Sequence, residues 1–380
     1  MAGFVAALGL CLLACERSKA TKGPLLDSSS QAAGSRACVV QLAGNWLNTC
    51  ALLGSGEARC WGGGGSRPYE AEPVALRGYP GPVSRLFVDR FALCASPADG
   101  SLWCDEYRSP YDPPHLPQLR REKSEKWPQQ QPFRAVQHLT AAGRCVLTKD
   151  ELRCWEERGE PVLITGLPSK PTQLVGGINY ACVLLENGQV FCRGYNVRGQ
   201  LGILEGATEE ERNSSRLQKY AGFTRVKALG DDTRLIAAGL DHSCALKRDG
   251  SVRCWGQNDK GQIGKGDISI CERTGGLLLS CTPEEGLEPS RVEGLPADIR
   301  DLALALGVGC AIDGQGSAWC WGELYEPTPR PVRLNVGAPV TALAIGEHWC
   351  ALLRDGRVLC QKDRQPLAWN DARTMSLGCP

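Results

Sequence analysis

The sequence predicts an all-β protein built from seven repeated units, and three observations carry this prediction. Helical periodicity is almost absent, whereas short apolar runs alternate with turn residues, as they do in β-proteins. Cysteines recur in local pairs whose first members are spaced by 50 residues on average. Glycine recurs at a fixed place within those pairs. A period of this length indicates a stacked or circular array of small units.

Composition places the chain among globular proteins. Its 380 residues include 43 Lys+Arg and 42 Asp+Glu, with 42% hydrophobic and 22% charged residues. This balance gives no electrostatic reason to expect a nucleic-acid partner. The length exceeds what one layered core usually fills, which favours several domains or a repeat architecture. Twenty cysteines indicate an oxidising compartment, because a reducing cytosol would keep them as reactive thiols.

The N-terminal element is expected to be an export signal. Residues 4–13 form an apolar run that is too short to span a bilayer as a helix. The run ends in Leu12-Leu13-Ala14-Cys15, which resembles the lipobox of bacterial lipoproteins, although no Lys or Arg precedes it. In that family the signal is cut before the cysteine, whose sulfur carries a lipid. We therefore expect a lipoprotein signal peptide over 1–14 and lipidation at Cys15, with a plain secretory signal or a buried helix as alternatives.

The next segment is expected to be a tether that joins the membrane anchor to the repeats. Residues 15–35 have almost no periodic apolar face and include a run of three serines at 28–30. Such a stretch is typical of a flexible linker. Residues 36–380 then form the repeat domain. This organisation predicts an exported protein, anchored at the outer membrane or cell surface and facing the periplasm or the exterior.

Seven cysteine pairs define the repeats. Each pair but one is separated by ten positions, and the exception by nine: Cys50/Cys60, Cys94/Cys104, Cys145/Cys154, Cys182/Cys192, Cys244/Cys254, Cys310/Cys320 and Cys350/Cys360. In every ten-spaced pair the sixth residue after the first cysteine is glycine: Gly56, Gly100, Gly188, Gly250, Gly316 and Gly356. A type I turn followed by a left-handed glycine closes a three-residue hairpin loop. Each pair therefore predicts one β-hairpin.

The hairpin loop sets the register of the two strands. A loop at 248–250 puts Cys244 opposite Cys254 and Leu246 opposite Val252, on one face of the ribbon. The same register pairs Leu52/Ala58, Leu184/Val190, Ile312/Ala318 and Leu352/Val358. The nine-spaced pair fits a two-residue turn at Lys149-Asp150, which aligns Cys145 with Cys154 and Leu147 with Leu152.

Opposed cysteines of this kind are expected to form disulfides. In a non-hydrogen-bonded site they lie about 4.5 Å apart at Cα, within disulfide range. Metal ligation and free buried thiols are the alternatives. The chain has no close Cys-x-x-Cys pair and only four histidines, so we expect no metal and no cofactor.

Four further cysteines remain outside the hairpins. Cys271 and Cys281 are ten apart but lack the glycine and a surrounding strand pattern, so we expect them to staple a Gly-rich excursion. Cys38 and Cys379 lie at opposite ends of the repeat domain. If the repeats close into a ring, these ends must meet, and a disulfide between them would lock the closure.

The segments between hairpins predict one more strand in front of each pair. Residues 340–346 precede Cys350 and residues 301–306 precede Cys310 as apolar runs. Two connections are long and polar, 106–132 and 203–219. We interpret both as solvated surface loops, with a binding role as the alternative.

Two repeats resemble a known family. Residues 238–264 contain Ala-Gly-Leu-Asp-His-Ser-Cys-Ala-Leu, then Asp-Gly-Ser-Val-Arg-Cys-Trp-Gly, then Asn258 and Gly261-Gln262-Ile263-Gly264, and residues 177–202 form a second copy. They are similar to the repeat of the regulator of chromosome condensation family, in particular its cysteine-paired version in bacterial lipoproteins. The other five repeats keep the hairpin but little of the tail. The resemblance, which runs from Arg36 onward, implies a seven-bladed β-propeller of four-stranded blades.

No motif identifies a catalytic site. The sequence contains no Gly-x-Ser-x-Gly, no phosphate-binding Gly-rich loop and no His-Glu-x-x-His. We interpret the glycines at 62–65 as a turn, and the acidic runs 231–232 and 209–211 as solvated. His242 and His348 occupy the same place, two before a cysteine, which favours a packing role. Tryptophans follow four of the pairs and are expected to pack between repeats, with a sugar-binding rim as the alternative: Trp61, Trp155, Trp255 and Trp321.

These observations favour a non-enzymatic, lipid-anchored, protein-binding or scaffold module with no nucleic-acid partner, acting as a monomer. An envelope polysaccharide-binding protein or a secreted carbohydrate-active enzyme is the alternative. Guanine-nucleotide exchange, the activity of the eukaryotic nuclear member of the family, is more remote. The loops on which that activity depends have no match here, and an exported protein does not meet a cytosolic GTPase.

Overall fold

The computed structural model describes residues 38–377 except the segments 45–47, 63–71, 77–80, 89–91, 107–119, 122–134, 141–143, 156–160, 204–218, 275–277, 283–285, 347–348, 362–368 and 370–371. The chain divides into two units, Met1–Arg36 and Ala37–Pro380. The signal peptide predicted for 1–14, the lipidation site Cys15 and the tether 15–35 lie outside the described residues. Among those described, no helix is long and apolar enough to cross a membrane.

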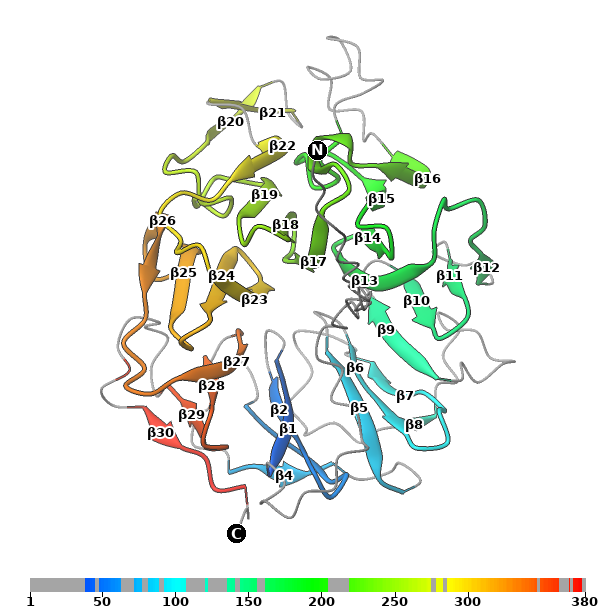
Figure 1. Cartoon of the computed structure of the whole chain (residues 1–380), viewed down its shortest axis with the longest axis vertical. Helices are drawn as coiled ribbons and strands as arrows, with labels where there is room; N and C mark the ends of the chain where they lie inside the picture. The colour runs from blue at the N-terminus through cyan, green and yellow to red at the C-terminus, as the bar shows by residue number, and fades with distance from the viewer. Residues whose placement is uncertain are drawn as a thin grey trace, which may run out of the picture. The chain divides into compact units, whose positions relative to one another are not determined.

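The described part of Ala37–Pro380 is an all-β propeller arrangement (Figure 1). Its strands form seven four-stranded antiparallel sheets and one two-stranded ribbon. A single short 3-10 helix, η1 (Lys227–Leu229), accompanies them within the described residues. In every four-stranded sheet the strands are added in chain order, so each repeat folds into its own sheet.

The strands have the following bounds. The first sheet contains β1 (Val39–Gly44), β2 (Asn48–Leu53), β3 (Ala58–Gly62) and β4 (Val74–Ala75), and the second contains β5 (Val83–Val88), β6 (Ala92–Pro97), β7 (Trp103–Glu106) and β8 (Arg120–Arg121). The third contains β9 (Val136–Thr140), β10 (Cys145–Thr148), β11 (Leu152–Cys154) and β12 (Val162–Leu163), and the fourth contains β13 (Pro171–Gly177), β14 (Tyr180–Leu185), β15 (Val190–Tyr195) and β16 (Lys219–Arg225).

The fifth sheet contains β17 (Thr233–Ala238), β18 (His242–Lys247), β19 (Val252–Gly256) and β22 (Gly286–Arg291), with the ribbon β20 (Ile270–Thr274) and β21 (Leu278–Thr282) inserted before β22. The sixth contains β23 (Ile299–Ala305), β24 (Val308–Asp313), β25 (Ala318–Glu323) and β26 (Pro327–Arg333). The seventh contains β27 (Val340–Ala344), β28 (Cys350–Leu353), β29 (Val358–Cys360) and β30 (Arg373–Thr374).

The predicted hairpin register is confirmed. Cys244 lies opposite Cys254 and Leu246 opposite Val252, and the shorter hairpin aligns Cys145 with Cys154. The loop of the fifth sheet is closed by a bond from Gly250 N–H to the Lys247 carbonyl at 3.1 Å. Gly250 has φ +85°, in the left-handed region that the sequence argument requires.

Disulfides join the opposed cysteines. Six of the predicted pairs are bonded: Cys50–Cys60, Cys145–Cys154, Cys182–Cys192, Cys244–Cys254, Cys310–Cys320 and Cys350–Cys360. Cys94 is also disulfide-bonded and lies opposite Cys104 in the ladder. Because each bond joins the two middle strands of its own sheet, it fixes the register within that sheet.

The cores lie between the sheets. Among the described residues, seven apolar clusters each combine side chains of two successive sheets. One of them joins Val39, Leu42 and Trp61 of the first sheet to Leu352 and Val358 of the seventh. The innermost strand β1 accordingly contacts both β5 and β27. The succession of sheets therefore returns to its starting point.

The cysteines at the two ends of the domain lie near this closing cluster. Cys38 packs against the cluster that contains Met375 and Leu377, and it is disulfide-bonded. Its predicted partner, Cys379, is outside the described residues.

Two interpretations of the sequence were wrong. Part of 106–132 was assigned to a solvated loop, but Arg120–Arg121 forms β8, which pairs with Trp103 and Cys104. Cys271 and Cys281 were placed in a segment without strands, whereas they lie opposite each other in the ribbon β20–β21. In both places the strand is short and lies within a long connection, so pairing with a neighbour outweighs a weak local signal.

We predict that removing one hairpin disulfide destabilises the domain without changing its fold. A Cys244→Ala/Cys254→Ala double variant opens a loop of sequence separation 10, which should cost about 2–3 kcal/mol of unfolding free energy. Guanidinium unfolding at equal protein concentration measures the shift in midpoint. An unchanged midpoint would contradict the stabilising role of these bonds.

Candidate interaction face

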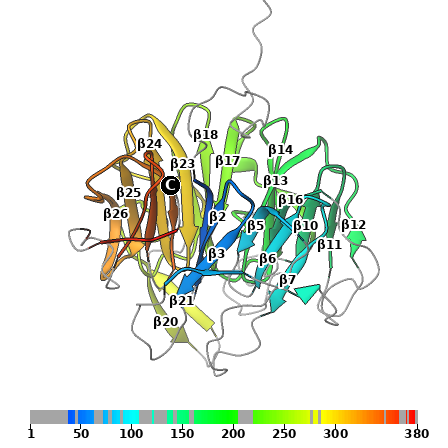
Figure 2. The same cartoon turned by 90° about the horizontal axis from the view of Figure 1, so that it is seen from below.

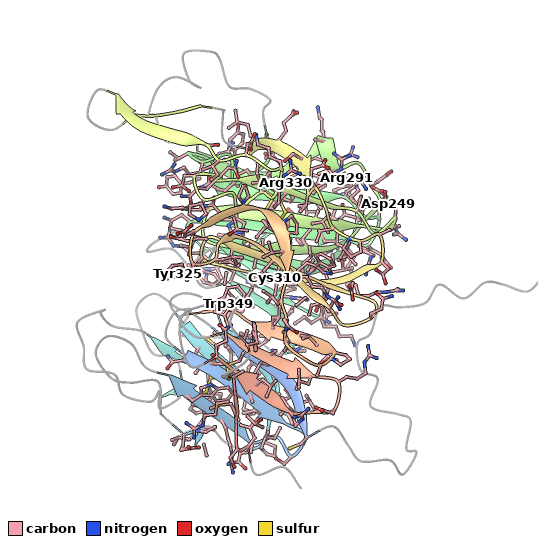
Figure 3. All side chains as sticks on the ribbon, turned by 90° about the vertical axis from the view of Figure 1, so that its left-hand side faces the viewer. Asp249, Arg291, Cys310, Tyr325, Arg330 and Trp349 are labelled. Atoms are coloured by element: carbon pink, nitrogen blue, oxygen red, sulfur yellow. A yellow bond between two sulfur atoms is a disulfide. The ribbon has the colours of Figure 1, made fainter. Side chains whose placement is uncertain are left out.

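Strand order determines which connections share an end of the sheets. In an antiparallel sheet the first-to-second and third-to-fourth connections leave from one end, and the hairpin loops leave from the other. We call the first end the connection face. Its described members are the turns 178–179, 239–241 and 306–307 and the connections 196–203, 257–269 and 324–326. Tyr325 on the connection face and Asp249 on a hairpin loop lie on opposite sides of the molecule in Figure 3.

The connection face collects the long and variable segments of the chain. The third-to-fourth connections differ widely in extent: 63–73, 107–119, 155–161, 196–218, 257–285, 324–326 and 361–372. The hairpin loops, such as 186–189 and 248–251, are all short, three to five residues between the strands. The ribbon β20–β21 extends beyond the ends of the sheets (Figure 2). Variable segments on a fixed scaffold are the usual location of recognition sites.

Successive sheets press together at the hairpin end. Gly188 has φ +82°, and a Cβ at this position would lie 2.2 Å from the Asp231 carbonyl oxygen. At Gly250 the corresponding distance to the Ala297 carbonyl oxygen is 2.0 Å. The repeated glycine therefore adopts the left-handed conformation that the turn requires. Its lack of a Cβ also leaves room for the segment that leads into the next sheet.

The tail of the two well-formed repeats folds into a compact connection. The Asn196 side-chain oxygen accepts a hydrogen bond from Leu201 N–H at 2.9 Å, and the Asn258 oxygen accepts one from Ile263 N–H at 3.3 Å. The Gln262 side-chain oxygen accepts the Lys260 N–H at 2.8 Å. The recurring Asn and Gln are thus turn-forming residues, which explains their spacing in the motif.

Buried tryptophans join these tails to the following sheet. Trp255 Nε1 donates to the Gln200 carbonyl at 2.9 Å, and Trp321 Nε1 donates to the Gln262 carbonyl at 2.8 Å. Trp61, Trp255 and Trp321 are 0% exposed and Trp155 is 6% exposed. Packing between repeats is therefore confirmed for all four, and these four side chains cannot form an aromatic rim for sugars.

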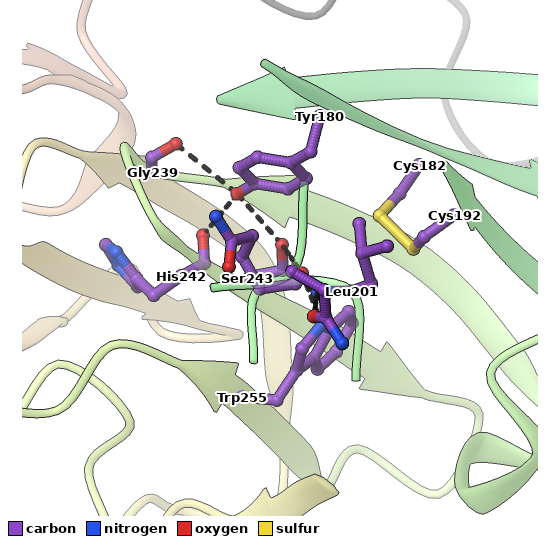
Figure 4. The surroundings of a disulfide bond; sticks show 10 residues. Tyr180, Cys182, Cys192, Leu201, Gly239, His242, Ser243 and Trp255 are labelled. Atoms are coloured by element: carbon purple, nitrogen blue, oxygen red, sulfur yellow. Dashed lines mark hydrogen bonds between the residues drawn. A yellow bond between two sulfur atoms is a disulfide. The ribbon is translucent and has the colours of Figure 1, made fainter. Parts of the chain in front are cut away.

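A buried polar group accompanies this packing (Figure 4). The Tyr180 hydroxyl donates to the His242 carbonyl at 2.8 Å and lies 3.0 Å from Ser243 Oγ. Burial raises the pKa of the tyrosine, and it lowers the pKa of the His242 imidazole to about 4. His242 Nε2 has no hydrogen-bond partner among the described residues. The predicted packing role of His242 fits this environment, and His348 lies outside the described residues.

A set of side chains that the sequence analysis missed joins the innermost strands. Gln41 Nε2 donates to the Leu86 carbonyl at 2.8 Å while its oxygen accepts Leu86 N–H at 2.9 Å. Gln173 makes the same pair of hydrogen bonds with the backbone of Ile236, at 2.8 and 2.9 Å. Arg85 donates to the Gln137 carbonyl at 2.6 Å. Gln41, Arg85 and Gln173 each stand nine residues before the first cysteine of a pair, a spacing that could have revealed them.

The remaining candidate residues are structural or lie outside the described part. Asp232 forms an ion pair with Lys247, which is 5% exposed and also donates to the Leu229 carbonyl. Gly63–Gly65 and the glutamates 209–211 are outside the described residues. The part of the chain that the structure describes contains no group of three or more His, Cys, Asp or Glu suited to a metal ion.

Two exposed apolar side chains lie in the connections of the connection face. Tyr325 is 71% exposed and Val197 is 50% exposed. Each sits in the connection that leads to the outer strand of its sheet. They are the described side chains on this face best suited to make apolar contacts with another molecule.

Comparison with known proteins identifies the repeats. The sequence model of the regulator of chromosome condensation (RCC1) repeat matches residues 172–200 and 234–262. The human E3 ubiquitin-protein ligase HERC2 is 25% identical over 222 residues, which are 55% of this chain and 4% of that protein. The human X-linked retinitis pigmentosa GTPase regulator is 32% identical over 114 residues, 30% of this chain and 10% of that protein. The chain thus spans a small part of these relatives.

Other similar proteins come from plants, yeast and bacteria. The ultraviolet-B receptor UVR8 of Arabidopsis thaliana is 32% identical over 130 residues, 31% of this chain and 27% of that protein. The crystal structure of Prp20p from Saccharomyces cerevisiae has a TM-score of 0.49 at 16% identity, covering 89% of this chain and 77% of that one. PorZ of Porphyromonas gingivalis has a TM-score of 0.48 at 11% identity, covering 90% and 38%.

We predict that the tryptophan hydrogen bond contributes to stability separately from indole packing. Trp321→Phe leaves the Gln262 carbonyl without its indole donor, whereas Trp61→Phe removes an indole N–H that has no partner among the described residues. Trp321→Phe should therefore cost about 1–2 kcal/mol more unfolding free energy than Trp61→Phe. Chemical denaturation of both variants measures the difference. Equal losses would show that the bond to Gln262 contributes nothing.

We also predict that His242 makes the domain acid-sensitive. Its folded pKa of about 4 lies below the ordinary histidine value of 6.5, so stability is fully present above pH 6.5 and is lost as pH falls toward 4. The full loss should approach about 3 kcal/mol. His242→Gln should flatten this part of the stability curve, as measured by unfolding at a series of pH values. A variant whose curve runs parallel to the wild type would contradict the assignment.

Proposed function

Because the chain belongs to the RCC-type repeat proteins, we propose that it is a non-enzymatic propeller that binds another protein. One of its relatives is named a GTPase regulator, a name that describes action on a protein. The proposal does not include nucleotide exchange, since the similarity to that relative covers 30% of this chain. We propose that the domain acts as a monomer.

The connection face is the proposed binding surface. Its support is the contrast between the two ends of the sheets. The hairpin loops are all three to five residues long, whereas the connection face carries segments of widely different length with Tyr325 and Val197 exposed among them. Partner recognition requires such sequence freedom together with a rigid base.

We further propose that each of the seven four-stranded sheets is one blade of a closed seven-bladed ring. The apolar cluster between the first and seventh sheets supports the closure. Each sheet is made from one stretch of chain, so no strand is shared between the two ends of the domain. A Cys38–Cys379 disulfide would supply the missing covalent link, in agreement with the bonded state of Cys38 beside Met375 and Leu377.

The proposed location is outside the cytosol. Six disulfides fit an exported or extracellular protein. The apolar run before Cys15 supplies the proposed export signal, and lipidation of Cys15 supplies the anchor at the outer membrane or cell surface. The partner would then be an envelope or extracellular protein.

The proposal predicts that substitutions on the two ends have different effects. Tyr325→Ser with Val197→Ser removes the exposed apolar side chains of the connection face, and Arg248→Ala is the matched change on an exposed hairpin loop. Cross-linking in native membranes followed by affinity purification should recover one partner with the wild type and with Arg248→Ala. Recovery with the double variant should fall at least about tenfold, because the loss of two apolar contacts should cost at least about 1.4 kcal/mol of binding free energy.

Two results would contradict this assignment. Recovery of the same partner by all three proteins would place binding elsewhere than the connection face. Recovery of no protein by the wild type, in membranes where it is lipidated at Cys15, would reject the protein-binding function.

A further inference from the structure

The outer strand of each sheet has one edge that no other strand of the sheet covers. Such an edge presents backbone N–H and C=O groups to which another strand can add. Three outer strands have six or seven residues, β16, β22 and β26, whereas β4, β8, β12 and β30 have two each. Among the strands that the structure describes, these three long edges offer a useful length for strand addition.

Proline closes the edge of β26. Thr328 and Val332 pair with Gly322 and Cys320 of β25, so the alternate residues between and beside them face away from the sheet. Those outward positions are 327, 329, 331 and 333, and the first three are proline. Because proline has no N–H, most of this edge cannot donate hydrogen bonds to an added strand.

The edge of β22 is closed in a similar way. Ser290 pairs with Cys254 of β19, which turns residue 289 outward. That residue is proline. Both β22 and β26 therefore carry the device by which natural sheets avoid unwanted pairing.

The edge of β16 lacks this protection. Tyr220 and Thr224 pair with Gly194 and Cys192 of β15, in the register of Thr328 and Val332 in β26. The outward positions equivalent to the three prolines are Lys219, Ala221 and Phe223, which all keep their N–H. Ala221 is exposed and Phe223 is half-buried. The strand lies at the end of its sheet and at the rim of the domain (Figure 1).

The charges of β16 indicate what kind of strand fits. Antiparallel pairing with β16 of a second copy about Gly222 would place Lys219 opposite Arg225 at both ends, and like charges in opposed positions are destabilising. An incoming strand with carboxylates at its ends would replace this repulsion with attraction.

We propose that the edge of β16 binds an extended peptide segment of a partner protein, which adds as a fifth strand and carries acidic residues near both ends. This inference specifies how the partner of the proposed function is bound. It rests on the proposed function only in requiring that the partner is a protein. The contact is a backbone ladder along Ala221–Arg225, so it requires little of the peptide sequence between its acidic ends.

The test uses the full chain and three synthetic ten-residue peptides. One alternates valine and threonine between terminal aspartates, the second has lysines at the ends, and the third has prolines at alternate central positions. Fluorescence anisotropy should show saturable binding of the aspartate peptide. Binding of the lysine peptide should be about tenfold weaker, as two reversed end pairs imply, and the proline peptide should not bind.

Two substitutions at one position separate the backbone from the side chain. Ala221→Pro removes an outward N–H and should fold, because Pro329 occupies the equivalent place in β26. It should weaken binding of the aspartate peptide at least about tenfold. Ala221→Val keeps the N–H and should leave binding unchanged.

Arg225→Glu should reverse the preference toward the lysine peptide, which gives a test that does not depend on proline.

Several results would overturn the inference. These are no saturable binding of the aspartate peptide, binding equal in wild type and Ala221→Pro, or a dimer of the full chain that Ala221→Pro dissociates. Binding that appears only after residues 204–218 are deleted would assign the edge to the chain's own segment. If the aspartate peptide does not bind while a partner is still recovered through the connection face, this inference is rejected and the proposed function stands.

Discussion

The disulfide across the two middle strands of each sheet is the constraint on which the rest of the structure depends. A slip of one residue between those strands would turn every side chain to the opposite face. In β19 the Cys254 side chain belongs to the core shared with the sixth sheet, whereas the adjacent Trp255 belongs to the core shared with the fourth. Fixing Cys254 opposite Cys244 therefore fixes which neighbour each residue of the strand contacts. The cores on both sides follow from that register.

The same arrangement separates the tasks of the two ends of the domain. At the hairpin end the short loop presses on the link to the next sheet, as Gly188 does on Asp231. At the other end the tails form turns held by Asn196 and Asn258 and are joined to the next sheet by buried tryptophans. Rigidity thus comes from within and between the sheets. The parts of the connections beyond these tails can then vary in length and sequence, which suits a recognition surface.

Sequence predicted the parts of the fold that are decided locally. The spacing of Cys182, Gly188 and Cys192 determines a turn and hence a register, so the hairpins could be placed residue by residue. The outer strands could not, because Arg120–Arg121 forms a strand only by pairing with β7. The role of Gln41 also escaped, since its partner Leu86 lies 45 residues away and belongs to another sheet. Cys271 and Cys281 show the same limit, because pairing of the ribbon outweighs its weak pattern.

The most direct test of this account is a count of free thiols in the native protein, alkylated during lysis and denatured without reductant. Of the 20 cysteines, Cys11 belongs to the predicted signal peptide and Cys15 to the predicted lipid anchor, which leaves eighteen in the repeat domain. We predict that none of the eighteen reacts before reduction and that all react after it. Reaction of most of them before reduction would contradict the paired hairpins, the covalent closure of the ring and the proposed location outside the cytosol.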